Sequence, residues 1–366
     1  MVWILLALPI TVLFIINGIV HFYFALKLNR MFAEKHNFIN SCFIVGLWMS
    51  AGLFYTFVYF NNDQSLFFFQ LLSLFFIMIF TPFLLYCILS YQNRLLKKEP
   101  KKKDKRIEFY FSKIKEIREE DDLENSNIDL TQKDYDLKTD IYRKFLHLVP
   151  AALIIGLWLF AVYVWEGIWE QDLVWGLSGR DFGQFLILTV GYSGVLIFAI
   201  LDYIRFSYIF KNFNLSHLLP DMVLDLLIKS MKKEEYYDFL KPAALTLALA
   251  SIFFLPFSIF TAAALISTIG DGAASLFGIK FGKHRFPKNK NKTLIGYISG
   301  FFVSFCVTYI SVAIFEKNLE IYKLITIALG GALTFFIIDF LNLKIDDDIL
   351  NPILCALTMA FLLFYI

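Results

Sequence analysis

The sequence predicts an all-α membrane protein, a polytopic transmembrane helical bundle of about ten spans. Two observations lead to this prediction. The chain of 366 residues is 58% hydrophobic and only 18% charged, which is too apolar for a water-soluble domain to cover with polar surface. Apolar runs of roughly 18 to 25 residues also recur along almost the whole chain, and each is long enough to cross a hydrocarbon core of about 30 Å.

The predicted spans follow these apolar runs in order. They lie at 3–26, 38–60, 65–91, 145–165, 184–209, 243–257, 258–281, 294–315, 324–343 and 349–366. The first run lacks a basic n-region and continues far beyond the h-region of a secretory signal, so we interpret it as a span. The run at 243–257 is the shortest. If it forms a re-entrant pair with 258–281, all other connections stay on the same side of the membrane, so the parity of the spans is unchanged.

Lysine and arginine gather on one set of connections between the spans. The connections at 27–37, 92–144, 210–242, 282–293 and 344–348 share one side and hold nearly all the basic residues, whereas those at 61–64, 166–183 and 316–323 lie on the other. Eleven basic residues fall between Arg94 and Arg118 alone. Because basic loops stay in the cytoplasm, we predict that the first set is cytoplasmic and that both termini are non-cytoplasmic.

A charged segment divides the chain into two membrane parts. Residues 92–141 are predicted to form a cytoplasmic linker. It separates an accessory N-terminal membrane segment of three spans, 1–91, from a seven-span part at 142–366. The second part contains every cluster of polar residues described below.

Two polar clusters lie where a helix meets the predicted cytoplasmic boundary. Arg143, Lys144 and His147 begin the fourth span, at a spacing that places His147 one helical turn from the basic residues. Basic residues in this place also serve as interface anchors. Asp202 and Arg205 end the fifth span, and their i,i+3 spacing favours a structural ion pair.

A third cluster surrounds Asp271. This residue lies inside an apolar run, where an ionisable side chain costs several kcal/mol and marks a candidate functional residue. Small residues recur at every fourth position around it: Gly270, Ala274, Gly278 and Gly282. That spacing lets two helices approach closely, so it needs no further explanation. Helix packing does not explain Asp271.

A basic loop follows this cluster directly. It contains Lys280, Lys283, His284, Arg285, Lys288, Lys290 and Lys292. Several cations beside a carboxylate suit a polyphosphate, which binds basic side chains together with a metal ion. A topology signal is the alternative explanation. The GxxxxGK[ST] spacing of a Walker A loop is absent.

The fourth cluster is the turn formed by Asp346, Asp347 and Asp348, with Asp339 in an apolar run about two turns earlier. Three adjacent carboxylates repel one another unless water or a cation neutralises them, so a solvated turn is the alternative to a metal site. All four clusters fall at predicted cytoplasmic span ends. Cations and carboxylates that converge beside the lipid predict a site that joins a soluble phosphorylated substrate to a lipid.

These motifs resemble the CTP-dependent lipid kinase family, which includes dolichol kinase, phytol kinase and the CTP-using diacylglycerol kinase of fungi. The resemblance covers about 142–366 and runs in order through RKFLH, LDYIRF, GDGAASLFGIKFGKHR with KTLIG, and DDDILNP. Two positions depart from the family pattern. Ile295 stands where the family usually has Glu in KTxEG, and Asp348 stands where it usually has Asn in DDNLTIP.

The resemblance implies that the γ-phosphoryl group of CTP is transferred, with Mg²⁺, to the hydroxyl of a membrane lipid alcohol. It implies Asp271, His147 and Lys292 as catalytic residues, and Asp271, Asp347 and Asp348 as metal ligands. The implied nucleotide-binding residues are Arg143, Lys144, Lys283, Arg285, Lys292, Thr293, Gly270, Gly282 and Gly296, and the remaining implied site residues are Asp202, Arg205 and Glu234. We expect an isoprenoid alcohol of the dolichol, polyprenol or phytol type as acceptor, with diacylglycerol as the alternative.

Two other functions stay open at this point. A phosphatidate cytidylyltransferase-like enzyme uses the same nucleotide and needs similar cations and metal ligands. A membrane transporter or non-enzymatic scaffold would instead spread polar residues through the membrane depth, whereas here they gather at one face. We expect a multi-pass protein of the endoplasmic reticulum or of a prokaryotic plasma membrane, with its site facing the cytoplasm and no nucleic-acid partner.

Overall fold

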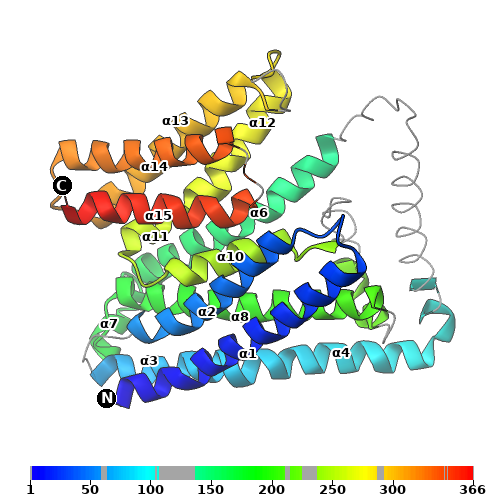
Figure 1. Cartoon of the computed structure of the whole chain (residues 1–366). Coiled ribbons are helices and arrows are strands. Elements are labelled where there is room, and N and C mark those ends of the chain that lie inside the picture. The colour runs from blue at the N-terminus through cyan, green and yellow to red at the C-terminus, as the bar shows by residue number, and fades with distance from the viewer. Residues whose placement is uncertain are drawn as a thin grey trace.

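The computed structural model confirms the all-α membrane bundle (Figure 1). It describes residues 2–58, 64–103, 105–106, 137–210, 215–224, 237–286, 292–341, 343 and 345–365, without the side chains of 2–5, 58, 64–66, 137–147, 208 and 216. Within these residues nine helices are long and apolar enough to cross a membrane.

The long helices follow the predicted apolar runs. They are α1 (Val2–Met31), α2 (Phe38–Val58), the continuous α3 (Gln64–Phe75), η1 (Phe76–Phe80) and α4 (Thr81–Lys98), α6 (Leu137–Leu159) with η2 (Phe160–Glu166), α8 (Gly179–Ile209), the continuous α11 (Phe257–Leu265), η5 (Ile266–Gly270) and α12 (Asp271–Phe281), α13 (Leu294–Phe315), α14 (Ile321–Leu341) and α15 (Asp347–Tyr365). The segments η1, η2 and η5 are π-helical turns. The short elements are α7 (Gln171–Trp175), the 3₁₀ turn η3 (Ser216–Leu218) and α10 (Lys241–Ile252).

Several predicted spans have a different length in the structure. Helix α1 continues past the predicted end at 26 to Met31, α6 begins at Leu137, inside the predicted linker 92–141, and α8 begins at Gly179, before the predicted start at 184. The third predicted span continues past the predicted end at 91 as far as Lys98, because basic residues in its last turn interact favourably with the helix dipole. The predicted span at 243–257 is the shorter helix α10, whose 12 residues extend about 18 Å. Pro256 begins the next helix and ends this one early.

Helix α10 is buried inside the bundle, where it packs against α2, α8 and α15. It reverses the chain direction before α11, as the predicted parity requires. Both termini consequently lie at the same end of the bundle (Figure 1). That this end is non-cytoplasmic stays a prediction.

The first two helices share one hydrophobic core with the later part of the chain. The ring of Phe14 lies 5.1 Å from the ring of Trp48 and 4.9 Å from that of Tyr192, centroid to centroid. The Tyr192 hydroxyl donates hydrogen bonds to Ala51 O at 2.8 Å and to Ala250 O at 3.3 Å. Helices α1 and α2 are therefore built into the bundle, and the predicted division between 1–91 and 142–366 leaves no gap between these two parts.

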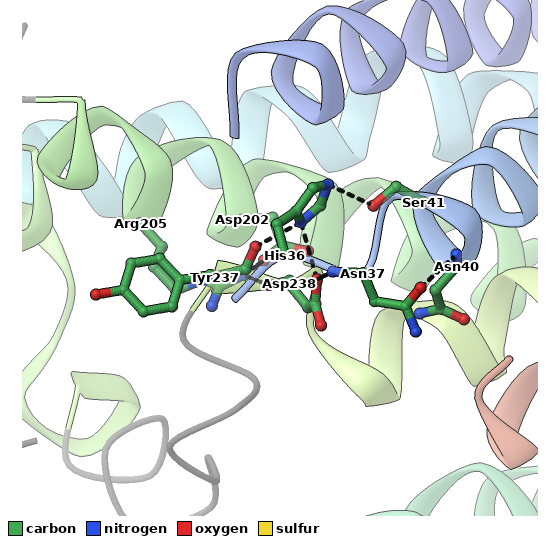
Figure 2. Close-up of polar contacts among 8 residues, drawn as sticks. All are labelled: His36, Asn37, Asn40, Ser41, Asp202, Arg205, Tyr237 and Asp238. Carbon is green, nitrogen blue, oxygen red and sulfur yellow. Dashed lines mark hydrogen bonds and ion pairs between the residues drawn. The ribbon is translucent and has the colours of Figure 1, made fainter. Parts of the chain in front are cut away.

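The turn between α1 and α2 is attached to the segment before α10 (Figure 2). His36 Nδ1 lies 2.9 Å from both Tyr237 O and Asp238 Oδ1, and Asn37 N donates to Asp238 Oδ1 at 3.0 Å. Because a carbonyl oxygen only accepts, His36 carries its proton on Nδ1, so Nε2 accepts from Ser41 Oγ at 3.3 Å. The network fixes the entrance of α2 against residues that lie about 200 positions later in the chain.

The predicted ion pair between Asp202 and Arg205 is confirmed, and both side chains are almost fully buried. Arg205 Nη2 donates to Asp202 Oδ1 at 2.7 Å and also to Asp238 O. Leu240 N donates to Asp202 Oδ2 at 3.2 Å. The pair thus satisfies backbone groups of the segment 238–240, which supports the structural interpretation of this motif.

Replacing Arg205 with Met is expected to destabilise the protein by about 3 to 5 kcal/mol, because Asp202 then stays buried without its counter-charge. The double variant Asp202→Asn/Arg205→Met should be more stable than Arg205→Met alone. Thermal unfolding of the purified variants in detergent measures both effects. A double variant whose loss equals the sum of the two single losses would show that the charges are not coupled.

Candidate functional site

A polar cavity of about 420 Å³ lies where α12, α13, α14 and α15 meet. In Figure 1 this is the end of the bundle away from both termini. The cavity is lined by Asp271, Ala274, Ser275, Gly278, Ile279, Gly282, Lys283, Arg285, Lys292, Thr293, Gly296, Tyr297, Asp339 and Asp347. Much of the predicted site therefore converges on one place.

Asp271 reaches the cavity from the junction of η5 and α12. It is buried, with 9% of its surface exposed, and it directly follows the π-helical turn. Its backbone N–H points at Ile266 O and Thr268 O. A π turn shifts the helix face by about one residue and occurs often at functional sites, so it explains how an otherwise apolar helix turns a carboxylate towards the cavity.

The small residues around Asp271 allow α12 to pack closely on α13. A Cβ atom on Gly278 would lie 3.4 Å from Gly296 Cα, and one on Gly296 would lie 2.8 Å from Ala274 O. A side chain at Gly270 would collide with Ser304 Oγ. The predicted close helix approach is therefore confirmed and accounts for Gly270 and Gly296. Their implied contact with a nucleotide stays a prediction.

The two ends of the basic loop are held together by backbone hydrogen bonds. Leu294 N donates to His284 O at 3.1 Å, and Phe286 N donates to Lys292 O at 3.0 Å. This short hairpin brings Lys283, Arg285 and Lys292 to the cavity. Residues 287–291, which include Lys288 and Lys290, lie outside the described residues.

The N-terminus of α13 also faces the cavity. Thr293 caps this helix, and its Oγ1 accepts a hydrogen bond from Gly296 N at 3.2 Å. Thr293, Gly296 and Tyr297 line the cavity. The positive end of the helix dipole adds to the charge of the three basic side chains, so this wall of the cavity suits an anion such as a phosphate.

Three carboxylates form an acidic wall of the cavity. Asp271 of α12, Asp339 of α14 and Asp347 of α15 each offer an oxygen atom, and these atoms lie within 4.8 Å of one another. Carboxylate oxygens are the ligands that Mg²⁺ prefers, and few of them are needed when a phosphate supplies the rest. The chemistry of this donor set fits a divalent cation such as Mg²⁺.

Lys292 links the basic wall to the acidic wall. Its ammonium group forms an ion pair with the Asp339 carboxylate, and Nζ lies 3.4 Å from Asp339 O. Burial alone would lower the pKa of Lys292, but the carboxylates of Asp339, Asp347 and Asp271 raise it above its ordinary value. Lys292 consequently stays charged at neutral pH and neutralises part of the acidic wall.

The turn before α15 is held by contacts with the protein, which differs from the solvated turn considered as an alternative. Lys241 Nζ lies 3.4 Å from Asp346 Oδ1, and Asp346 N donates to Asn40 Oδ1 at 3.1 Å. Asp348 is buried, and its N–H donates to Asp346 Oδ1 at 3.2 Å. Burial raises the pKa of Asp346, and the nearby Asp348 carboxylate raises it further.

The acidic turn adjoins the polar cavity through Asp347. Oxygen atoms of Asp346, Asp347 and Asp348 also lie within 4.8 Å of one another, and Asp347 belongs to both carboxylate groups. Asp348 does not line the cavity. Its implied role as a metal ligand stays a prediction.

The sequence analysis named Asp339 beside the acidic turn without giving it a role in the site, and it missed Lys241 and Tyr297. Asp339 was identifiable by the criterion that selected Asp271, an ionisable side chain in an apolar run. Lys241, at the start of α10, belongs to none of the sequence motifs described above. Tyr297 is almost fully buried and lines the cavity, and its hydroxyl has no hydrogen-bond partner in the part of the chain that the structure describes. That hydroxyl is available to a bound anion.

The remaining predicted residues lie elsewhere. Arg143, Lys144 and His147 are on α6, which packs against η5 and α12, but their side chains are outside what the structure describes. Glu234 lies outside the described residues as well. The pair Asp202 and Arg205 is absent from the cavity lining.

One departure from the pattern of the resembled family, Ile295, lies outside the cavity. Ile295 is 39% exposed and does not line the cavity, so its side chain takes no part in this arrangement. Asp339 supplies a carboxylate to the same cavity from another helix. The site accordingly has three carboxylates without a Glu at position 295.

The order Ser41–His36–Asp238 in Figure 2 is that of a nucleophilic triad. Ser41, however, is only 1% exposed, and the polar cavity is lined by other residues. A nucleophile needs access to its substrate. We therefore assign this network the structural role described above.

No family model, no curated protein and no solved structure matches the chain. The geometry itself combines a cationic wall, a carboxylate wall and a position at one end of a membrane bundle. Such a site can bind a metal-complexed phosphate beside the lipid.

Lys292→Met is expected to destabilise the protein by about 1 to 3 kcal/mol, because it leaves Asp339 beside two other carboxylates without a cation. Adding Asp339→Asn to this variant should recover part of the loss. Thermal unfolding without divalent cations measures the effect. Lys280→Met is the control, because the ammonium group of Lys280 lies over the Phe281 ring instead of beside a carboxylate. Equal stability of the Lys292 and Lys280 variants would show that Lys292 does not neutralise the site.

Proposed function

We propose that this chain is an integral-membrane lipid kinase that transfers the γ-phosphoryl group of CTP to the hydroxyl of a membrane alcohol. One observation carries the proposal: Asp271, Asp339 and Asp347 face Lys283, Arg285 and Lys292 in a single cavity at the end of the membrane bundle. A phosphoryl transfer depends chiefly on positioning and on neutralising charge, and this set of residues provides both.

Each wall of the cavity has a part in the transfer. Lys292, Lys283 and Arg285, with the N-terminus of α13, bind the phosphate oxygens and hold the γ-phosphoryl group in place. Asp271, Asp339 and Asp347 would hold Mg²⁺, which would neutralise phosphate charge. Asp271 or His147 accepts the proton of the attacking hydroxyl.

The nucleotide and the acceptor are proposed from the sequence resemblance. It favours CTP as the donor and an isoprenoid alcohol of the dolichol, polyprenol or phytol type as the acceptor, with diacylglycerol as the alternative. We place the site on the cytoplasmic side of the endoplasmic reticulum or of a prokaryotic plasma membrane, because the basic connections share this end. CTP is then supplied from the cytoplasm and the alcohol from the bilayer.

Purified protein supplied with CTP labelled at the γ-phosphate is expected to transfer the label to a lipid alcohol, and Asp271→Asn should lower the rate by at least about a hundredfold. Asp181→Asn is the matched control, because Asp181 lies at the start of α8 and bonds only locally to Ser178. CTP labelled at the α-phosphate should transfer nothing. Label that enters lipid only from the α-phosphate would mean a cytidylyltransferase instead.

A further inference from the structure

An apolar pocket of about 550 Å³ lies within the membrane-spanning part of the bundle, apart from the polar cavity. Its walls come from η1 and α4, α6, α8, α10 and α11. A pocket of this volume is in the range of small-molecule binding sites. It lies among helices that cross the hydrocarbon layer, so we expect its occupant to come from the lipid.

Three polar side chains of this pocket, those of Thr189, Tyr192 and Thr246, are hydrogen-bonded within the protein. Thr189 Oγ1 donates to Ser73 Oγ at 2.9 Å, and Thr246 Oγ1 donates to Pro242 O at 2.7 Å. The Tyr192 hydroxyl bonds to two backbone carbonyl oxygens. A polar ligand would find few partners here and would lose its own hydrogen bonds to water. The pocket therefore suits a hydrocarbon.

The pocket is connected to the polar cavity through a charged residue in its lining, Lys241. Lys241 is the single charged residue among the described lining residues, and it pairs with Asp346. Asp346 lies beside Asp347, which lines the polar cavity with Asp271. From Lys241 the pocket follows α10 to Phe253, a distance of about 18 Å along the helix.

We propose that this pocket binds the hydrocarbon chain of a single-chain membrane alcohol, with the hydroxyl of the alcohol at the Lys241 end. The inference rests on the proposed function, because that function requires an acceptor hydroxyl beside the carboxylates. The volume accommodates the part of one chain nearest the hydroxyl, and the rest of a longer chain stays in the bilayer. A lipid with two acyl chains would leave one chain outside.

The proposal gives the third span a place in the acceptor site. Phe76 and Phe80 of η1 and Thr81 of α4 line the pocket, although the family resemblance begins only at about 142. The segment that the sequence marks as accessory thus forms one wall of the binding site. We expect it to contribute to the choice of lipid.

Two glycines of α8 provide a direct test of the pocket. A Cβ atom on Gly191 would have no other atom within 4 Å, and one on Gly194 would lie 4.0 Å from Thr246 Cγ2. A Cβ atom at either position therefore meets no backbone atom, and because both glycines line the pocket, leucine there is expected to take up part of its volume. Gly156 of α6 is the matched control, because a Cβ atom there also meets nothing within 4 Å and the residue does not line the pocket.

The experiment uses the full chain in lipid nanodiscs and a geranylgeraniol analogue that carries a photoreactive diazirine, without nucleotide. Peptides from η1, α4, α6, α8 and α10 are expected to carry the adduct. Gly191→Leu and Gly194→Leu should each lower the labelling roughly tenfold, because the added groups occupy the space of the chain. Gly156→Leu should label like the unchanged protein, and gel filtration with thermal unfolding verifies that all three variants fold.

Equal labelling of the Gly191, Gly194 and Gly156 variants, or adducts confined to other helices, would overturn the proposal. Competition by dioleoylglycerol as strong as that by geranylgeraniol would overturn the assignment to a single-chain alcohol. Because labelling needs no CTP, its result is independent of phosphoryl transfer. Pocket labelling without transfer from CTP would support the lipid site and reject the kinase, whereas transfer without pocket labelling would reject the lipid site alone.

Discussion

The ion pair between Lys292 and Asp339 is the contact on which the polar cavity depends. Three carboxylates from three different helices repel one another at the edge of a membrane, where water cannot fully screen them. Lys292 lowers this repulsion and at the same time presents its charge to the cavity. The same rule applies at Asp202, which is paired with Arg205, and at Asp346, which is paired with Lys241. Each of these buried acids has its own cation, and the cations fix how the helix ends meet.

Hydrogen bonds connect the N-terminal helices to the site. Asn40 of α2 accepts a hydrogen bond from the backbone of Asp346, and the His36 network holds the start of α2 against the segment that leads into α10. Helix α10 begins with Lys241, which lies between the acidic turn and the apolar pocket. The first helices thus support the acidic turn from one side, while the third span forms a wall of the pocket. Removing residues 1–91 would therefore expose the acidic turn and open the wall of the pocket.

Local features of the sequence were enough for most of the fold and part of the site. Apolar run length predicted the spans, the i,i+3 spacing predicted the pair Asp202–Arg205, and a charge in an apolar run identified Asp271. Lys241 was missed and Asp339 was given no role, because their partners lie 105 and 47 positions away and meet them only in the folded bundle. Helix α10 was predicted too long because hydropathy does not register the break that Pro256 imposes.

We propose that Asp271, Asp339 and Asp347 bind a divalent cation in the cavity that Lys292 also lines. Anomalous diffraction at the manganese edge, from crystals of the full chain grown with Mn²⁺ and a non-hydrolysable CTP analogue, tests it directly. We expect a manganese peak within coordination distance of at least two of these carboxylates, with the phosphates of the analogue beside Lys292. A manganese peak elsewhere, or none with the analogue bound away from this cavity, would contradict it.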